Sequence, residues 1–566
     1  MAVSAEAPTT TTRTELDAAV ERLRAGAPSF ARLGITGRIA LAESMRVGYG
    51  RIAARGVRAA CEAKELAVGT AAEAEEWIAH PFITLVHLRL WIAALRSIER
   101  SGTTTIGRVG RTIDGRPLVK VFPSNLLDAT LFPRVHGEVH LQAGASPDDR
   151  ARFYRQPDHE GRVVLVLGGG NVNSIPPLDV ATKLLNEGKV CLLKMNPVNA
   201  YLGPLIEEAF AEAVRQNFFA VVYGGADEGG YLAHHAGVDE VLITGSDRTH
   251  DLLVWGPPGP EREARQAANR ALLDKPMTSE LGNISPVIVV PGPYNDRQMA
   301  WQAQNIGGGV TNNASFNCNA NKMLITARGW DGRRRLLDAL ERVFERTPVR
   351  AAYYPGAQER YRLLTEGRRD SRTIGPTRVG TLPWTLLTDL DSNDATELAF
   401  RMEPFCSILS ETTLDHAGTI EFLERAVDFA NDRLWGTLSA TIVIHPSTLR
   451  EPGVAEALER AIVQLRYGTV GINIWAAYGF ALGTPWGGHP TSSTADIQSG
   501  HGFVHNVAML EGVEKTVVRH PLTVFPKPPH FPGHRAADRL GRRLVAREET
   551  GGALKLFQVV AAAVRG

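Results

Sequence analysis

The sequence predicts an α/β protein in which parallel strands are covered by helices on both faces. Between Arg162 and Gly245, short apolar runs alternate with helical segments, and the first run, VVLVLGGG, ends in glycines. A second stretch of the same kind extends from Ser285 to about Ala476. Continuous apolar runs separated by helices are typical of parallel strands that are buried on both faces. Because the chain has 566 residues, we expect two or three domains rather than one core.

The elements follow one another in a simple order. Residues 15–101 are rich in Ala, Arg, Glu and Leu with helical periodicity, and a more strand-like stretch with RPLVKVFP and RVHGEVHLQAG follows. In the first α/β region we expect strands at VVLVLGGG, KVCLLKM, FFAVVYGG and DEVLITG, and helices at PPLDVATKLLNEG and PLIEEAFAEAVRQ. In the second we expect strands at SPVIVV, KMLIT and ATIVIH and a helix at DGRRRLLDALERVFERT. The Pro-rich segment HPLTVFPKPPHFPGHR is predicted to wrap over a neighbouring surface.

Composition excludes several classes of partner. A formal net charge of +1 gives no electrostatic reason to expect nucleic acid or an anionic membrane, and no unbroken apolar stretch approaches the ~18 residues of a membrane span. The 16 histidines never adopt a metal-ligand spacing, so no metal site is predicted. The four cysteines form no Cys-x-x-Cys pair and no disulfide framework. Because the N-terminus lacks the features of a signal peptide, the chain is predicted to be cytoplasmic.

Six segments that carry polar and reactive side chains occur in one order. They are LLKMNPVNA, ITGSDRTH, ELGNISP, NNASFNCNANK, MEPFCSI and GINIWAAYGFALGTPWGG. By this order and spacing, residues 136–500 resemble the aldehyde dehydrogenase superfamily, although several single motifs are degraded. The resemblance implies an NAD(P)-dependent oxidoreductase with a parallel-sheet cofactor domain, an α/β catalytic domain and a small bridging sheet for oligomerisation.

The resemblance also implies a division of the chain and an assembly. We expect an N-terminal helical part of the cofactor domain (1–135), bridging strands (136–160), a dinucleotide-binding domain (161–282), a catalytic domain (283–480), and a C-terminal bridging or oligomerisation segment with a tail (481–566). Strands near residues 134–143 and the region after Gly487 are expected to pair between the subunits of a homodimer or homotetramer.

Cys318 matches the nucleophile of the family. A thiolate attacks the aldehyde carbon, and the thiohemiacetal passes a hydride to the nicotinamide and becomes a thioester. A structural cysteine would have apolar neighbours. The neighbours here are polar instead: Asn312, Asn313, Asn317, Asn319 and Asn321. Glu280, in ELGN, precedes Cys318 by a separation similar to the family's and is predicted to take a proton from the water that hydrolyses the thioester.

Stabilisation of the oxyanion requires a side-chain amide and a backbone N–H. The family supplies the amide from an asparagine after the first glycine-ended strand, and GGGNVNSIP offers Asn171 and Asn173. Counting back from Lys194 favours Asn171, whereas the proline that follows favours Asn173. Both therefore stay candidates, and both are also suited to capping the next helix.

NADP or NAD is the expected cofactor. Lys194, at the end of KVCLLKM, matches the lysine that meets the adenosine ribose. Gly245 and Ser246 match the turn that leads a helix towards the phosphates. Glu403 and Phe405 match the pair that holds the nicotinamide ribose and packs on its ring.

Two departures from the family bear on the choice of cofactor. NAD-specific members commonly have a glutamate three residues after the matching lysine, where this chain has Pro197, which neither binds nor repels a 2′-phosphate. Asn196 and Asn199 are suited to donate further hydrogen bonds, so NADP is predicted to serve at least as well as NAD. His250 stands where the family often has glycine, and the extra segment GPPGPEREAR is expected to cover the adenine side.

The substrate is predicted to be a small-molecule aldehyde of unspecified chain length, and Trp475, Tyr478 and Phe480 either line an aromatic entrance or belong to the core. An alternative function is that of a CoA-dependent acylating aldehyde dehydrogenase or fatty acyl-CoA reductase, because GGGNVNSIPPLDVATKLLNEGKVCLLK is similar to that class. There the thiol of CoA, not water, releases the acyl group. Glu280, usually absent from that class, favours hydrolysis. A non-catalytic structural or binding homologue is disfavoured by the presence of both Cys318 and Glu280.

Overall fold

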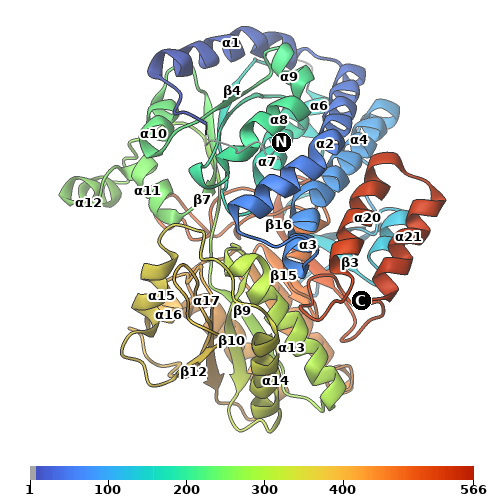
Figure 1. Cartoon of the computed structure of the whole chain (residues 1–566), viewed down its shortest axis with the longest axis vertical. Helices are drawn as coiled ribbons and strands as arrows, with labels where there is room; N and C mark the ends of the chain where they lie inside the picture. The colour runs from blue at the N-terminus through green and yellow to red at the C-terminus, as the bar shows by residue number, and fades with distance from the viewer. Residues whose placement is uncertain (1–7, 157–158) are drawn as a thin grey trace.

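The computed structural model describes residues 8–156 and 159–566, which form two sheets surrounded by helices. The first sheet lies in the upper half of Figure 1 and the second in the lower half. The α/β class that the alternating strands and helices predict is confirmed.

The upper sheet has five parallel strands in the order β6-β5-β4-β7-β8. They are β4 (Val163–Leu167), β5 (Val190–Lys194), β6 (Phe219–Val222), β7 (Glu240–Gly245) and β8 (Met277–Leu281). Every residue of β4 and β5 is buried, which is why both appear in the sequence as unbroken apolar runs. Because the strands are parallel, their carboxyl ends share one edge, where Lys194, Gly245 and Glu280 lie.

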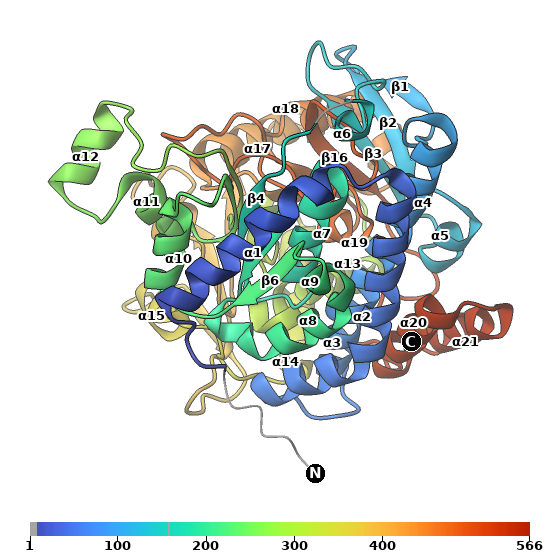
Figure 2. The ribbon, with the colours of Figure 1, turned by 90° about the horizontal axis from the view of Figure 1, so that it is seen from above.

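Helices cover both faces of this sheet. Helix α1 (Arg13–Ala31) lies across β4, β5 and β6 (Figure 2). Helix α7 (Ile175–Glu187) follows the glycines after β4, begins with two prolines and ends at Gly188, whose φ of 64° suits glycine. The other helices of this half are α2 (Ile35–Ala63), η2 (Pro197–Leu202), α8 (Gly203–Ala209), α9 (Ala211–Arg215), α10 (Ala226–His234) and α11 (Asp247–Trp255).

The extra segment after α11 does not cover the adenine side as expected. It forms helix α12 (Pro260–Ala267), which contains no buried residue and projects away from the body of the molecule in Figures 1 and 2. The sequence PEREARQA offers no large apolar side chain to pack against the sheet, so the helix stays in solvent.

The lower sheet has eleven strands in the order β1-β2-β3-β16-β15-β14-β9-β10-β13-β12-β11. The strands from the second half of the chain are β9 (Ser285–Val289), β10 (Asn321–Ala327), β11 (Ser371–Ile374), β12 (Trp384–Leu390), β13 (Ile408–Leu414), β14 (Ser439–Val443), β15 (Thr469–Ile472) and β16 (Val513–Arg519). Helices α13 (Asp296–Thr311) and α14 (Gly332–Arg346) share one core with this sheet, and α17 (Thr419–Arg433) and α18 (Val454–Gln464) share another. Alternate residues of β9, Val287 and Ile288, belong to these two cores, as in a sheet covered on both faces.

The bridging strands complete this sheet within one chain. Strand β3 (His136–Leu141) pairs antiparallel with β16, and β16 pairs parallel with β15. Strands β2 (Pro117–Phe122) and β1 (Val109–Arg111) continue the sheet beyond β3. The two segments that were expected to pair between subunits therefore pair with each other in a single chain. The oligomeric state stays a prediction.

The helices at the two ends of the chain compare differently with expectation: residues 71–101 are helical as predicted, whereas the C-terminal helices were not predicted. One continuous helix comprises α3 (Ala71–Trp77), the π-helical turn η1 (Ile78–Phe82) and α4 (Ile83–Ser101). It is long and apolar enough to cross a membrane, but 72% of its most apolar window is buried in the protein, as in a core helix. The C-terminal tail is also helical: α20 (Ala537–Thr550) and α21 (Ala553–Val564) form a hairpin that packs on α3 and η1 (Figure 1).

Candidate active site

Cys318 lies in a loop between α13 and β10, which we call the Cys318 loop (residues 312–320). Three consecutive residues have positive φ, Asn313 at 51°, Ala314 at 53° and Ser315 at 70°. Asparagine tolerates this conformation, but alanine and serine adopt it at a cost in energy. Such strain persists only where surrounding contacts impose it, and it concentrates at functional sites.

Glu280 of β8 reaches the Cys318 thiol. Its side chain is 3% exposed, and its Oε1 has no hydrogen-bond partner among the described residues. Burial raises the pKa of Glu280 to about 8, helped by the charges of Asp179 and Glu403, whereas the adjacent Cys318 thiol lowers it. Burial, together with the Glu280 charge, also raises the pKa of Cys318 well above its usual value. Both groups are therefore largely protonated near neutral pH. Glu280 is the one that can lose or gain a proton there, because its pKa is the closer of the two to neutral.

A buried lysine that the sequence did not single out supports this loop. Lys322, at the start of β10, donates hydrogen bonds from Nζ to the carbonyl oxygens of Cys318 (2.9 Å) and Asn283 (3.0 Å). It also forms an ion pair with Glu403 at 2.6 Å. Its positive charge lowers the pKa of Cys318 against the larger effect of burial. The only sequence signal was a lysine just after the cysteine loop, which by itself indicates a solvated strand end.

The predicted nicotinamide-ribose pair lies beside the Cys318 loop. Glu403 approaches the backbone so closely that a Cβ at Gly282 would lie 1.8 Å from its Oε2, so a larger residue there would displace the carboxylate. Burial raises the pKa of Glu403, and Lys322 opposes that shift. The Phe405 ring lies 5.9 Å from the Phe316 ring, centroid to centroid. Glu403 is therefore close enough to Cys318 for its charge to act on the thiol, and Phe405 packs on a ring of the Cys318 loop.

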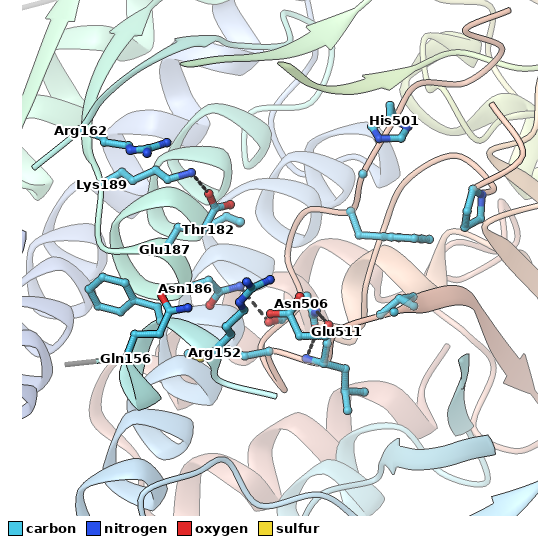
Figure 3. A pocket seen from close by; sticks show the side chains of 18 of the residues that line it. Arg152, Gln156, Arg162, Thr182, Asn186, Glu187, Lys189, His501, Asn506 and Glu511 are labelled. Atoms are coloured by element: carbon cyan, nitrogen blue, oxygen red, sulfur yellow. Dashed lines mark hydrogen bonds and ion pairs between the residues drawn. The ribbon is translucent and has the colours of Figure 1, made fainter. Parts of the chain in front are cut away.

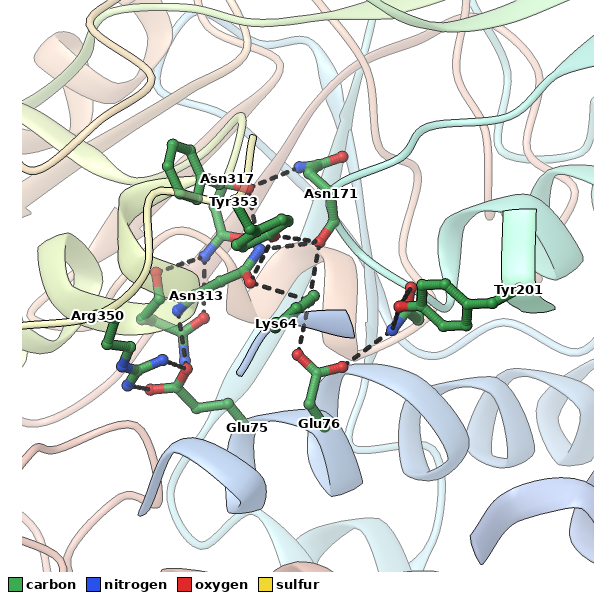
Figure 4. A network of polar contacts seen from close by, with 12 residues as sticks. Lys64, Glu75, Glu76, Asn171, Tyr201, Asn313, Asn317, Arg350 and Tyr353 are labelled. Atoms are coloured by element: carbon green, nitrogen blue, oxygen red, sulfur yellow. Dashed lines mark hydrogen bonds and ion pairs between the residues drawn. The ribbon is translucent and has the colours of Figure 1, made fainter. Parts of the chain in front are cut away.

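The structure separates the two asparagine candidates for the oxyanion site. The Asn171 side chain donates to the Phe316 carbonyl at 3.0 Å, within the segment that leads into Cys318. The Asn173 side chain donates instead to Glu76 at 3.0 Å and to the Tyr201 hydroxyl at 3.2 Å (Figure 4). Asn171 thus belongs to the Cys318 loop, and Asn173 to a network beside it. The sequence could not distinguish them because they are separated by a single residue.

That network joins the N-terminal helices to the Cys318 loop (Figure 4). Lys64, directly after α2, forms a buried ion pair with Glu76 at 2.6 Å and donates to Asn313 Oδ1 at 3.0 Å. Arg350 binds both oxygens of Glu75, at 2.6 and 2.7 Å, and Glu75 accepts from the Asn313 backbone N–H at 2.8 Å. These contacts hold Asn313 in its left-handed conformation.

The predicted dinucleotide residues lie at the carboxyl edge of the upper sheet. Burial lowers the pKa of Lys194 to about 8, and Glu228 of α10 opposes the shift with its charge. Ser246 Oγ accepts from the Thr249 backbone N–H at 3.2 Å and so caps α11, while Gly245 and Ser246 remain exposed. Asn196 uses its side-chain oxygen to cap η2, which begins at Pro197. His250 is buried below the cap and contacts Asp251 at 3.2 Å.

Glu228 was not foreseen. Its side chain caps the backbone N–H of Gly225 at 2.7 Å, and it is the carboxylate that acts on Lys194. The family places its carboxylate three residues after the lysine, where this chain has Pro197. A carboxylate from another element therefore acts on Lys194 at this edge, and the preference for NADP stays a prediction.

An apolar cavity of about 350 Å³ adjoins Cys318, and we call it the Cys318 cavity. Cys318, Asn317 and Asn319 line it together with the three predicted aromatic residues Trp475, Tyr478 and Phe480. The Trp475 indole donates to the Asn319 carbonyl at 2.7 Å, which fixes that ring against the Cys318 loop.

A separate cavity of about 750 Å³ lies near the opposite edge of the upper sheet (Figure 3). Arg162 and Lys189, which line it, directly precede β4 and β5, so they lie at the amino ends of these strands. Lys189 is paired with Glu187 at 2.5 Å. Dinucleotides bind at the carboxyl ends of parallel strands, so this cavity is not the expected cofactor site.

Comparisons with known proteins identify the fold. No family model and no curated protein matches the chain. The aldehyde dehydrogenase from Bartonella henselae superposes with a TM-score of 0.61 at 16% identity, covering 91% of this chain and 92% of its own. The NADP-dependent glyceraldehyde-3-phosphate dehydrogenase from Bacillus halodurans C-125 gives 0.60 at 16%, covering 90% and 92%. The gamma-glutamyl-gamma-aminobutyraldehyde dehydrogenase from Burkholderia cenocepacia J2315 gives 0.60 at 20%, covering 90% and 89%. The chain therefore has the fold of the aldehyde dehydrogenases, as its sequence resemblance predicts.

Proposed function

We propose that the protein oxidises an aldehyde to a carboxylic acid with NAD or NADP as hydride acceptor, through a thioester on Cys318. The observation that carries this proposal is the position of the buried Glu280 carboxyl beside the thiol of Cys318, which lines an apolar cavity. A glutamate whose pKa is raised to about 8 serves as a general base near neutral pH.

The residues act in two stages. Ionised Glu280 takes the proton of the Cys318 thiol, and the sulfur attacks the carbonyl carbon to form a carbon–sulfur bond. The Asn171 amide, released from Phe316, and a backbone N–H of the Cys318 loop stabilise the oxyanion. A bound nicotinamide dinucleotide supplies the hydride acceptor that turns this adduct into the thioester. Glu280 releases the thiol proton to solvent and, ionised again, takes a proton from water, whose oxygen attacks the thioester carbon; the sulfur leaves as the thiolate and the carboxylic acid is released.

The carboxyl edge of the upper sheet fits a dinucleotide. Lys194 would bind the adenosine ribose, and the exposed amino end of α11 at Ser246 would bind the phosphates. Glu403 and Phe405 would hold the nicotinamide ribose and ring beside Cys318. Lys322 occupies one oxygen of Glu403, and the other oxygen remains for a ribose hydroxyl.

The test is formation of reduced nucleotide from NAD⁺ and NADP⁺ with simple aldehydes. Cys318→Ser should abolish turnover and labelling of the site by iodoacetamide. Cys406→Ser is the matched control, because Cys406 is buried in the core of the lower sheet and should tolerate the change without loss of the reaction. Substantial turnover by Cys318→Ser would refute the proposal.

Transfer to CoA instead of water is the competing outcome, carried forward from the similarity to fatty acyl-CoA reductases. Glu280 favours water, because its unpartnered oxygen is placed to accept a proton beside the thioester. Efficient reduction of acyl-CoA by reduced nucleotide, with no hydrolysis of the thioester, would establish the CoA-dependent reaction.

A further inference from the structure

The Cys318 cavity also indicates which aldehydes fit. We propose that the substrate carries an uncharged, extended aliphatic chain that occupies this cavity. The reaction assigned to Cys318 rests on the function proposed above, whereas the class of ligand in the cavity can be tested without turnover.

The wall of the cavity is apolar on several sides. It is built from the π-helical turn η1, the start of α4, the loop after α5 (Leu126–Leu131), helix α19 (Tyr478–Ala481) and the C-terminal hairpin. Its large apolar side chains include Ile78, Phe82, Phe132, Ile474, Leu544 and Val559. Each methylene of a chain placed there leaves water for hydrocarbon, which is favourable by about 0.8 kcal/mol, or roughly fourfold in binding.

The polar groups in the wall are already satisfied or uncharged. Glu75 is neutralised by Arg350. Burial lowers the pKa of His520 to about 4 and that of His530 to about 3, so both rings are neutral near neutral pH. Lys527, whose Nζ donates to the Gly533 carbonyl at 3.0 Å, is the only lysine or arginine among the described lining residues. A carboxylate or phosphate placed in this cavity would therefore be desolvated with Lys527, already bonded to Gly533, as the one cation in the described wall.

The C-terminal hairpin forms a fixed part of this wall. Helix α20 is anchored by the ion pair of Arg542 with Glu73 and by that of Arg89 with buried Glu548, the latter at 2.9 Å. Val559 of α21 is 4% exposed and faces the cavity, whereas Val564 at the end of the same helix is 48% exposed and does not line it. The helix therefore carries an inner and an outer valine that can be compared directly.

The volume sets the length of the chain. A methylene is similar in size to a water molecule, which occupies about 30 Å³ in the liquid. The cavity of about 350 Å³ therefore accepts a chain on the order of ten carbons. Aldehydes shorter than this leave part of the apolar wall uncovered.

The first experiment measures kcat/KM for unbranched aldehydes from propanal to dodecanal. We expect an increase of roughly fourfold for each added methylene, levelling off near decanal. Butanal should exceed 4-oxobutanoate by more than about tenfold, because the carboxylate of 4-oxobutanoate loses its hydration against an apolar wall. A flat dependence on length, or equal use of butanal and 4-oxobutanoate, overturns the inference while leaving aldehyde oxidation intact.

The second experiment does not need turnover or nucleotide. The rate at which Cys318 is alkylated by N-decyl iodoacetamide is compared with the rate for iodoacetamide, using free cysteine as the reference for intrinsic reactivity. The decyl reagent should react faster at Cys318 by about a hundredfold or more after that correction. Equal corrected rates show that the cavity does not bind the chain, whatever the reaction turns out to be.

A matched pair of variants places the chain in the cavity. Val559→Trp fills the inner face of α21 and should lower the ratio of decanal to propanal kcat/KM by about tenfold or more. Val564→Trp, the same change on the outer face, should leave this ratio and both rates unaltered. An unchanged ratio in a folded Val559→Trp protein shows that the chain lies elsewhere.

Discussion

The Cys318 loop differs from the carboxyl edge of the upper sheet, which we call the nucleotide edge. The difference lies in how many of their hydrogen-bonding groups are already bonded to other protein atoms. In the Cys318 loop, Asn313 and Lys322 direct their hydrogen bonds to neighbouring protein atoms, and the loop is held in a strained conformation. At the nucleotide edge, Gly245 and Ser246 are exposed, and the capped end of α11 faces outward. The reacting thiol is thus fixed before any ligand arrives, whereas the nucleotide edge keeps its donors for a ligand.

The largest effect is expected from Glu280→Gln, which keeps the shape of the side chain but removes the base. Steady-state kcat should fall by about 10²–10⁴. A slowed burst of reduced nucleotide should remain, because the thioester still forms but is no longer hydrolysed. Rapid mixing and absorbance of the reduced nucleotide measure both phases. Glu21→Gln, on the exposed face of α1, is the control, and full turnover restored by added CoA would contradict hydrolysis.

A large loss of stability is expected from Lys64→Met, which leaves Glu76 buried without its cation. Removing one member of a buried ion pair typically costs about 3–5 kcal/mol. The free energy of unfolding in urea measures this change, with Lys120→Met on the exposed face of β2 as the matched control. A loss below about 1 kcal/mol would show that the network does not hold the loop.

The rate should depend on pH in a direction that the pKa of Glu280 determines. Because this pKa is raised to about 8, the ionised base is present above that pH and is lost as the pH falls. We expect kcat/KM to drop by about tenfold for each pH unit below the midpoint. A rate that is constant between mildly acidic and mildly alkaline pH would exclude Glu280 as the group that titrates.

A smaller effect is expected at the nucleotide edge, where Glu228 opposes the phosphate of NADP. Glu228→Gln should raise the ratio of kcat/KM for NADP⁺ to that for NAD⁺ by about tenfold, because a negative charge near Lys194 disappears. Pro197→Glu should lower the same ratio by restoring a carboxylate to the family's position. If neither change moves the ratio, the ribose lies elsewhere on this edge.

The features that the sequence predicted are those with a local signal. Strands β4 and β5 are buried on both faces, so their apolar runs were unmistakable. Cys318 and Glu280 were found through the order of their segments. Lys64, Lys322 and Glu228 were missed, because a single charged residue in a helix or at a strand end normally indicates solvent exposure. Their roles depend on contacts between distant segments.

The C-terminal helices were missed for a different reason. The Pro-rich stretch before them suggested an irregular tail, although the amphipathic repeat in Leu540, Leu544 and Val545 was present. Helix α21 is apolar almost throughout, so the sequence alone does not show which of its faces is buried against the cavity and which is exposed.

The pairing of β3 with β16 constrains how the chain can be made. Glu138 and Arg519 bond across this pair although they lie 381 residues apart in the sequence. Strands β1 to β3 emerge early from the ribosome, but their neighbour in the sheet is synthesised near the end. The backbone groups on the edge of β3 that pairs with β16 therefore stay unpaired through most of translation, and the protein is expected to need protection from aggregation until its last strand arrives.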